Sequence, residues 1–223
     1  MDVLEAMTTR RSVRGFRPDP VPRETVEAIL AAASRAPSGS NIQPWKVRVT
    51  MGAEKARLSR AIHAARDAGE GTGREYQYYP REWREPYLAR RRATGWGLYS
   101  LLGIGKGDRA ATYRQHGRNY DFFGAPVGLF FSMDRDMEQG AWLDCGMFIQ
   151  NVMLAARGFG LHTCPQAAFC DFHRVVRREL GIAEDQILLC GMALGHADPE
   201  EPANRLVTER EPVFGFATFG PWE

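Results

Sequence analysis

Residues 37–45 have the sequence Pro37-Ser38-Gly39-Ser40-Asn41-Ile42-Gln43-Pro44-Trp45 and connect a predicted helix to a predicted strand. Before this loop, apolar residues recur at the spacing of an amphipathic helix, at Val26, Ile29, Leu30 and Ala33. After it, Val47 and Val49 alternate with polar residues, as in a half-buried strand. The loop carries donors suited to the rim of a flat heterocycle, although any helix-to-strand connection uses such turn-forming residues.

The rest of the chain continues to mix helices and strands. Helices are expected at about 2–9, 53–65, 136–157 and 171–180, and strands at 127–133, near Leu161 and at 187–194. Asp171 is a candidate N-cap for the last of these helices, and Gly158 and Gly181 are candidate C-terminal glycines. The long helical block between the first two strands favours a mixed α+β sandwich over a regular ladder of parallel strands. We expect one domain, 1–223, with a lid or insert at about 66–118.

Composition narrows the class of protein. The 223 residues carry a net charge of +2, which is too close to zero to suggest nucleic acid or an anionic membrane as partner. No apolar run approaches the roughly 18 residues that cross a bilayer. The N-terminus lacks the apolar region of a secretion signal, so a cytoplasmic location is expected. No C-x-x-C pair occurs, so we expect buried thiols rather than a metal site or disulfides at Cys145, Cys164, Cys170 and Cys190.

The sequence contains neither the glycine-rich loop of a Rossmann dinucleotide-binding site nor the G-x-x-x-x-G-K-[ST] phosphate-binding loop. Residues 103–107, Gly-Ile-Gly-Lys-Gly, lack the third glycine of a dinucleotide-binding loop and follow no convincing strand. A bound phosphate would therefore need arginines, whose guanidinium forks match phosphate oxygens. Such a group stands near the N-terminus, at Arg10, Arg11, Ser12 and Arg14, although a solvated basic turn has the same composition.

Taken in order, these segments resemble the nitroreductase family of FMN enzymes. The resemblance begins with Arg10-Arg11-Ser12-Val13-Arg14 and continues with Ala36-Pro37-Ser38-Gly39-Ser40-Asn41-Ile42-Gln43-Pro44-Trp45. It extends through residues 160–169, GLHTCPQAAF, and residues 192–199, MALGHADP. It closes with Arg205 and residues 208–212, TEREP. These motifs span nearly the whole chain, and only residues 66–118 depart from the general pattern.

The resemblance implies an FMN site between two subunits. It assigns the FMN phosphate to Arg10, Ser12, Arg14 and Arg210, and the pyrimidine side of the ring to Arg11. A second subunit would supply Pro37, Ser38, Gly39, Ser40, Asn41 and Gln43. Backbone groups after Pro165, at Gln166, Ala167 and Ala168, would lie beside flavin N5. Some relatives carry an acid near position 167, and here only a main-chain N–H remains. Asn119 is the expected contact to the O2 edge, with Gln115 or His116 as alternatives.

The resemblance also implies the reaction and the assembly. NADH or NADPH and a small aromatic acceptor would use one open face of the flavin in turn, in a ping-pong cycle. No catalytic side chain is assigned, because the cofactor carries the chemistry at N5. The expected fold is a central, mostly antiparallel sheet flanked by helices, in a domain-swapped homodimer. The proline-rich tail agrees with this, since alone it could not bury Phe214, Phe216, Phe219 and Trp222.

The divergent segment 66–118 is basic and aromatic, with eleven Arg or Lys against six Asp or Glu. One interpretation is a solvated helix with aromatic residues facing the core, and contacts to nucleic acid are disfavoured by the balanced whole-chain charge. The functional interpretation is a lid in which arginine pairs with a carboxylate on a nitrobenzoate-like acceptor. Its candidate substrate residues are Arg84, Tyr87, Arg91, Trp96 and Tyr99.

Nitroaromatic reduction is thus the leading hypothesis for function. The same fold could instead reduce quinones or enones, or dehalogenate aromatic compounds, since the lid sequence does not settle the acceptor. A more distant alternative is a non-catalytic module that binds flavin or nucleic acid. A yellow protein that is bleached by NAD(P)H separates these classes.

Overall fold

A four-stranded antiparallel sheet forms the centre of the computed structural model, which describes residues 1–71 and 73–221. The strand order is β1-β2-β4-β3, and every neighbouring pair runs antiparallel. The strands are β1 (Lys46–Met51), β2 (Val127–Asp134), β3 (His162–Gln166) and β4 (Gln186–Gly195). The α+β class with a mostly antiparallel sheet is therefore confirmed.

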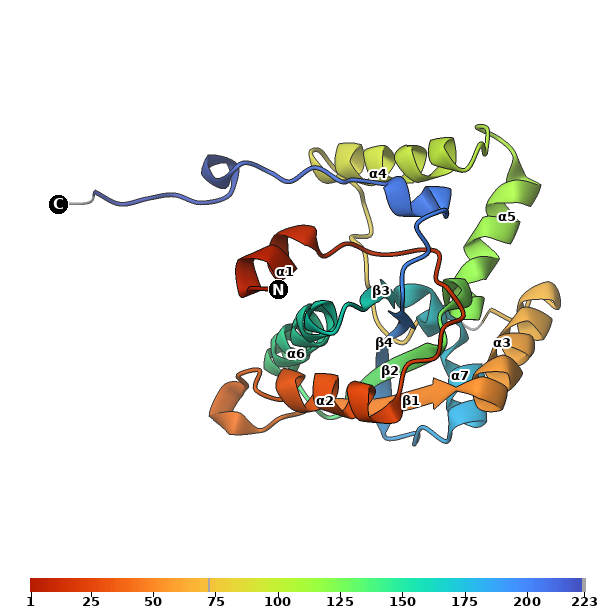
Figure 1. Cartoon of the computed structure of the whole chain (residues 1–223), viewed down its shortest axis with the longest axis horizontal. Helices are drawn as coiled ribbons and strands as arrows, with labels where there is room; N and C mark the ends of the chain where they lie inside the picture. The colour runs from red at the N-terminus through yellow and green to blue at the C-terminus, as the bar shows by residue number, and fades with distance from the viewer. Residues whose placement is uncertain (72, 222–223) are drawn as a thin grey trace.

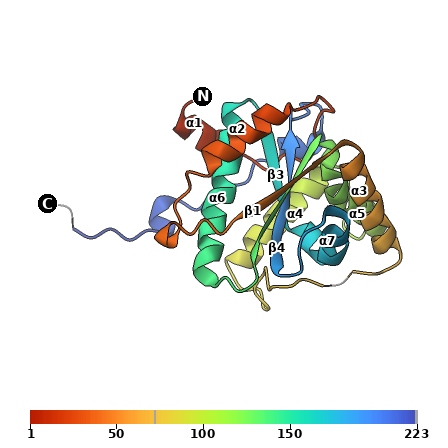
Figure 2. The same ribbon diagram turned by 90° about the horizontal axis from the view of Figure 1, so that it is seen from below.

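Seven α-helices surround this sheet in the described residues (Figures 1 and 2). They are α1 (Val3–Thr9), α2 (Arg23–Ala33), α3 (Gly52–Asp67), α4 (Tyr87–Leu101), α5 (Arg109–Gly117), α6 (Gln139–Gly158) and α7 (His173–Leu180). Short 3-10 helices connect them at Gly39–Asn41, Arg118–Gly124, Ala167–Phe172, Pro202–Arg205 and Val213–Gly215. None of the described helices has the length and apolarity needed to cross a bilayer.

The sheet separates two hydrophobic clusters. Helices α2 and α6 cover one face, where Ile29 packs with Leu129 and Phe131 of β2. Helices α3 and α7 cover the other face, where Leu58 packs with Phe130. Successive residues of a strand point to opposite faces, so β2 must be apolar on both sides to fill both clusters. The continuous apolar sequence of the two central strands therefore follows from their burial on both faces.

The start of α7 differs from the expectation. Asp171 does not cap this helix, because a 3-10 helix occupies Ala167–Phe172 and α7 begins only at His173. The Asp171 carboxylate instead accepts hydrogen bonds from Arg74 Nε, at 2.6 Å, and Nη2, at 3.3 Å. The end of α7 is as expected, with Gly181 in the left-handed region at φ +67°. At the end of α6, Gly158 remains helical and Gly160 takes the left-handed conformation, at φ +70°.

The divergent segment forms a layer outside these clusters. Helix α4 has no buried residue and lies beside the 3-10 helix Pro202–Arg205 of the tail (Figure 1). Gly97 of α4 lies so close to Leu206 that an added Cβ would stand 3.0 Å from Leu206 Cδ1. The structure therefore places this helix against the tail rather than in the core, and its role as a lid stays a prediction.

Candidate functional site

The basic N-terminal turn lies along the open edge of β3. Ser12 forms a parallel bridge with Thr163, and Val13 N donates to Thr163 O at 3.1 Å. Strand β3 pairs with β4 on its other side, so this edge is available to the turn. The pairing brings the basic motif at residues 10–14 next to the motif at residues 160–169, although about 150 residues separate them.

The charge of Arg210, which lies 200 residues later in the tail, acts on Arg10. Burial, and then the charge of Arg210, lower the pKa of the half-buried Arg10 guanidinium. Arg14 Nη1 and Arg210 Nη1 donate only to nearby oxygens, those of Ser12 and Thr208 among them. Within residues 1–71 and 73–221, none of the four site arginines forms an ion pair with a carboxylate; these are Arg10, Arg11, Arg14 and Arg210. Converging cations without an acid are suited to an anion such as phosphate.

Asn204 fastens the tail to this turn, and sequence reasoning missed it. Its Oδ1 accepts from Arg14 N at 2.7 Å, and its Nδ2 donates to Gly15 O and Asp198 O, both at 2.8 Å. The side chain is only 5% exposed. A single asparagine in an irregular segment has no periodic signal, so only the folded structure identifies this contact.

Two predicted cofactor residues from distant motifs meet at the other end of β3. Gln166 Nε2 donates to Asn119 O at 2.7 Å and to Asn119 Oδ1 at 3.3 Å. Asn119 Nδ2 in turn donates to the carbonyl of His116 at 2.9 Å. Desolvation lowers the pKa of the His116 ring from its ordinary value. His116, an alternative to Asn119 in the sequence prediction, therefore supports Asn119 through its backbone.

Strand β3 also carries buried polar atoms that find no partner among the described residues. They are His162 Nδ1, Thr163 Oγ1 and Gln166 Oε1. Buried polar groups are normally hydrogen-bonded, and His162 and Gln166, which share one face of β3, are therefore suited to a polar ligand that completes the site. Together with the unpaired arginines, these atoms fit a group that has a phosphate and a heterocycle with a polar rim. The residues present are therefore compatible with FMN.

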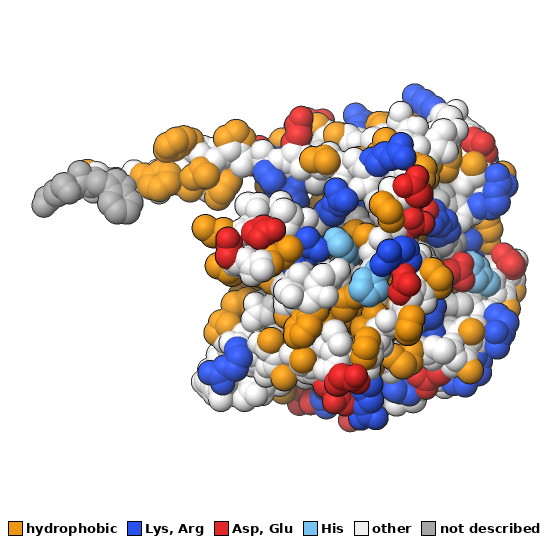
Figure 3. Space-filling model, in the orientation of Figure 1, with side chains coloured by type: hydrophobic (Ala, Val, Ile, Leu, Met, Phe, Trp, Pro, Cys, Tyr) orange, Lys and Arg blue, Asp and Glu red, His pale blue; other side chains and the backbone are white. Residues whose placement is uncertain are grey.

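A second missed residue, Arg157 of α6, extends the basic region. Its Nη1 lies 2.7 Å from His162 Nε2. Burial, and then the charges of Arg157 and Arg11, lower the pKa of His162 to about 4. His196 also contributes to this lowering, so it lies nearby. Figure 3 shows basic and histidine side chains gathered in the middle of this face of the molecule.

The predicted N5 contacts follow β3 directly. Gln166 ends β3, and Ala167 and Ala168 begin the 3-10 helix that follows. Pro165 and the two alanines are partly exposed, whereas Gln166 is buried. No acidic side chain occupies residues 165–168, which leaves main-chain N–H groups as the available donors.

The loop at residues 37–43 lies elsewhere in the same chain. It follows α2 at the end of the molecule opposite α3, in both views (Figures 1 and 2). Ser40, Asn41 and Gln43 adopt positive φ angles of 49°, 57° and 50°. Non-glycine residues in this region are strained, at roughly 1–3 kcal/mol each, and such strain is commonly kept at functional sites. Bonds from Gly39 N to Asp144 Oδ2, at 3.2 Å, and from Gln43 N to Ser38 Oγ, at 3.0 Å, hold the loop in this shape.

The predicted substrate residues divide between the two ends of α4. At its start, the Arg84 guanidinium lies 5.1 Å from the Tyr87 ring centroid, and Arg91 lies 4.6 Å from that of Trp83. Trp83 was not predicted. In the described part of the chain Arg84 and Arg91 form no ion pair, whereas Arg90 pairs with Glu211 of the tail. Trp96 and Tyr99 lie about one to two turns further along, where Trp96 is half-exposed.

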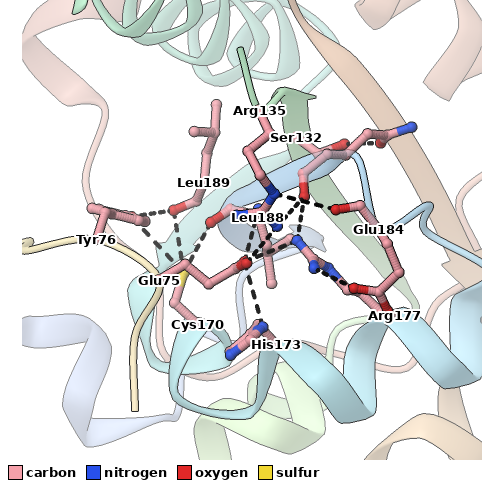
Figure 4. Close-up of polar contacts among 11 residues, drawn as sticks. Glu75, Tyr76, Ser132, Arg135, Cys170, His173, Arg177, Glu184, Leu188 and Leu189 are labelled. Atoms are coloured by element: carbon pink, nitrogen blue, oxygen red, sulfur yellow. Dashed lines mark hydrogen bonds and ion pairs between the residues drawn. The ribbon is translucent and has the colours of Figure 1, made fainter. Parts of the chain in front are cut away.

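An ionic network around Glu75 holds the segment that precedes α4 against the rest of the molecule (Figure 4). Glu75 Oε1 accepts from Arg135 at 2.7 Å, and its Oε2 accepts from Arg177 at 2.9 Å and lies 3.4 Å from His173 Nδ1. Burial acts to raise the pKa of Glu75, but the hydrogen bond from Arg135 and the charges of His173 and Arg177 hold it below its usual value. The adjacent Tyr76 hydroxyl donates to Leu189 O. The segment that leads to α4 therefore starts from a fixed point on α7 and β4.

Comparison with known proteins identifies matches over almost the whole chain. A family model described as "Nitroreductase family" matches residues 7–196. The chain is 43% identical to "4-nitrobenzoate reductase" of Nocardioides sp. (strain LMS-CY), over 94% of this chain and 86% of that protein. It is 42% identical to "Nitrobenzene nitroreductase" of Ectopseudomonas oleovorans, over 94% and 93%. The crystal structure of "FMN and NADPH-dependent nitroreductase NfnB from sphigopyxis sp. strain HMH" superposes with a TM-score of 0.96, at 40% identity over 100% of both chains.

Proposed function

This chain belongs to the nitroreductase family, and on that premise we propose that it is an FMN-dependent oxidoreductase that uses NAD(P)H to reduce nitroaromatic compounds. The observation that carries the proposal is a group of arginines that lies beside the open edge of β3, where Ser12 bridges Thr163, and that has no carboxylate partner among the described residues. Such a group of guanidinium ions favours an anion, and the FMN phosphate supplies one.

The residues of this chain hold the cofactor, and FMN when bound supplies the electron-transfer chemistry. Arg10, Ser12, Arg14 and Arg210 bind its phosphate. Arg11, whose charge reaches His162, provides positive charge on the pyrimidine side. Main-chain N–H groups at residues 166–168 take the place of an acid near N5. No side chain of the site is assigned as a general acid or base, so protons come from water.

The decisive experiment identifies the cofactor. We expect the purified protein to be yellow, to release FMN on heating, and to lose its colour when NADH or NADPH is added without oxygen. Oxidation rates with each nicotinamide determine the preference between NADH and NADPH. A protein that purifies without flavin and takes up none from excess FMN would contradict the proposal.

The active form is a homodimer in which each subunit completes the site of the other. Large apolar side chains are exposed on α1, at Leu4 (69%), on α6, at Leu143 (72%), and in the tail, at Phe214 (87%). Single chains rarely expose so many large apolar groups in adjacent segments. The tail also projects away from the body of the molecule (Figures 1 and 3). Trp222, which the sequence placed in the same apolar set, lies outside the described residues.

The dimer also accounts for the position of the 37–43 loop. That loop lies apart from Arg10 and Ser12 in its own chain, with its strained residues exposed. A partner subunit that supplies its 37–43 loop would place this loop beside residues 10–14 and 160–169. The cytoplasmic location expected from the sequence stays a prediction.

The acceptor class proposed is the carboxylated nitroaromatics. Support comes from Arg84 and Arg91, two cations that each stack on an aromatic ring and have no carboxylate among the described residues. The names of the relatives include acceptors with and without a carboxylate, since one is called a 4-nitrobenzoate reductase and another a nitrobenzene nitroreductase.

A substrate comparison tests this choice. We expect kcat/KM to be higher for 4-nitrobenzoate than for nitrobenzene. Arg84→Ala or Arg91→Ala should reduce that ratio by about tenfold, the effect of one lost hydrogen bond to a charged group. The control is Arg60→Ala, which removes an exposed arginine of α3. Equal kcat/KM values for the two substrates, or a ratio that neither lid variant changes, would eliminate carboxylate recognition while leaving nitro reduction intact.

A further inference from the structure

The amide pair formed by Asn119 and Gln166 has a function beyond holding two segments together. We propose that Gln166 is a positioning residue that orients the Asn119 amide so that it donates a hydrogen bond to the flavin, and so favours reduced FMN. The inference rests on the proposed function, because it needs FMN to bind where Asn119 reaches the ring. It assigns a role to the Gln166 side chain in addition to that of its backbone.

Backbone carbonyls determine the orientation of both amides. A carbonyl oxygen only accepts hydrogen bonds, so the Gln166 atom 2.7 Å from Asn119 O must be its NH2 group. By the same reasoning, the Asn119 atom 2.9 Å from His116 O must be Nδ2. These two assignments agree with each other, because they direct Gln166 Nε2 at Asn119 Oδ1, 3.3 Å away. Neither amide can rotate by 180° without placing two acceptors against each other.

The fixed orientation leaves Asn119 as a donor. One Nδ2 hydrogen goes to His116 O, and the second has no partner among the described residues. Oδ1 already accepts from Gln166. Asn119 is partly exposed, so a ligand can reach its free N–H. Reduction adds negative charge to the pyrimidine side of a flavin, and a preorganised donor binds that charge more strongly than it binds the oxidised ring.

The Gln166 side chain joins β3 to the segment of Asn119, but only one end of its amide is used for that purpose. The side chain is only 2% exposed, and its Oε1 is buried without a donor in the described part of the chain. Burying an amide with one end unsatisfied lowers stability relative to an apolar residue of similar size. The bond to Asn119 Oδ1 is the contact through which Gln166 acts on the amide that we propose to donate to the flavin.

The test measures the reduction potential of FMN in reconstituted holoprotein, together with FMN affinity and thermal stability. We expect Gln166→Leu to weaken the preference for reduced over oxidised FMN by about tenfold, the effect of one hydrogen bond to a charged group. For a two-electron couple that change lowers the midpoint potential by about 30 mV. In an Asn119→Leu background, Gln166→Leu should lower the potential no further. Thr50→Val, which changes a buried hydroxyl on the far edge strand, is the control and should leave the potential unchanged.

The outcomes separate this inference from the function itself. An unchanged potential in Gln166→Leu, or an equal shift in the Asn119→Leu background, overturns the positioning role while a wild-type protein that binds FMN preserves the proposed function. If the leucine variant does not fold, Gln166→Met replaces it with an unbranched side chain of similar volume, under the same expectations. A wild-type protein that binds no FMN refutes the proposed function, on which this inference rests.

Discussion

Arg10 and Arg210 carry like charges that oppose each other until an anion lies between them. The lowered pKa of Arg10 reflects its burial and this repulsion. Phosphate reverses the sign of the interaction, since each guanidinium then gains charge-assisted hydrogen bonds. If the FMN phosphate binds these arginines as proposed, the pair is unfavourable in the apoprotein and favourable in the holoprotein, and the two states should respond differently to the same substitution.

Substitution of either arginine tests this directly. Arg10→Ala or Arg210→Ala should weaken FMN binding about tenfold to a hundredfold, as for a lost hydrogen bond to a charged group. The thermal midpoint of the apoprotein should not fall in Arg210→Ala, whereas that of the holoprotein should. Fluorescence titration of apoprotein and thermal melts supply the two measurements. Arg17→Ala, which removes an exposed partner of Asp19, is the control, and an equal loss of FMN affinity there would contradict the assignment.

His162 predicts a dependence of stability on pH. Its folded-state pKa is about 4, below the unfolded value of about 6.5, because burial and the charge of Arg157 disfavour the protonated ring. Between these two values the unfolded chain binds more protons, so stability falls as pH decreases from about 6.5 to about 4. The contribution is at most about 3 kcal/mol, and solvent around the partly exposed ring reduces it.

Urea denaturation across this pH window measures the effect. His162→Gln should flatten the pH dependence of the free energy of unfolding between pH 4 and 6.5. His63→Gln, on α3, provides the comparison with a histidine outside the site. A His162 variant with the slope of the wild type would show that other groups cause the acid sensitivity.

At the scale of elements, the Glu75 network should contribute strongly to stability. Arg177 is 5% exposed, and Glu75→Ala would leave its guanidinium buried without its main carboxylate partner. Removing one member of a buried ion pair costs about 3–5 kcal/mol. Chemical denaturation of the holoprotein should show a loss of that order. The exposed pair Arg23–Glu27 is a matched control, because Glu27→Ala should cost less than about 1 kcal/mol. A loss of similar size in both variants would mean that solvent reaches Glu75 freely.

Most elements could be predicted from local patterns, and the exceptions have physical causes. Strands β2 and β4 are continuous apolar runs, and α2 and α6 have clear glycine or proline ends, so all four were placed to within a few residues. Helix α4 gave no periodic signal because none of its residues is buried. Asp171 resembled a helix cap, but its carboxylate pairs with Arg74, almost 100 residues away, and sequence patterns do not report such contacts.

The features of the site that local motifs carry could be predicted, and those that depend on tertiary contacts could not. Family and fold class are confirmed, because ordered motifs carry them along the chain, and FMN dependence stays a proposal. The individual contacts to FMN and substrate stay predictions. Asn204 was missed because its partner Arg14 is distant in sequence, and Trp83 because it acts through stacking. Arg157 was missed because its contact with His162 depends on how the chain turns between α6 and β3. The Gln166 side chain belongs with them, because its partner is Asn119, 47 residues earlier.

At the scale of the whole molecule, dimer formation and cofactor binding should be one process. The exposed apolar groups of α6 and the tail lie on segments that a partner would cover, and the 37–43 loop that should contact FMN is exposed. Leu143→Glu places a charge among these groups, and burying an unpaired charge is strongly unfavourable. We expect this variant to be largely monomeric at micromolar concentration by light scattering, and to release FMN on dilution. Removal of residues 212–223, which keeps Arg210, should have the same two effects.

The informative result is whether FMN content and dimer fraction change together with protein concentration. A variant that only misfolds would lose FMN and the dimer at every concentration. FMN content should rise with protein concentration in parallel with the fraction of dimer, because the ligand binds a site that exists only in the dimer. Arg60→Glu adds the same charge to an exposed position of α3, away from these groups, and should remain a dimer. A monomeric Leu143→Glu protein that retained stoichiometric FMN would show that one chain holds the cofactor alone, and the 37–43 loop would then need a different role.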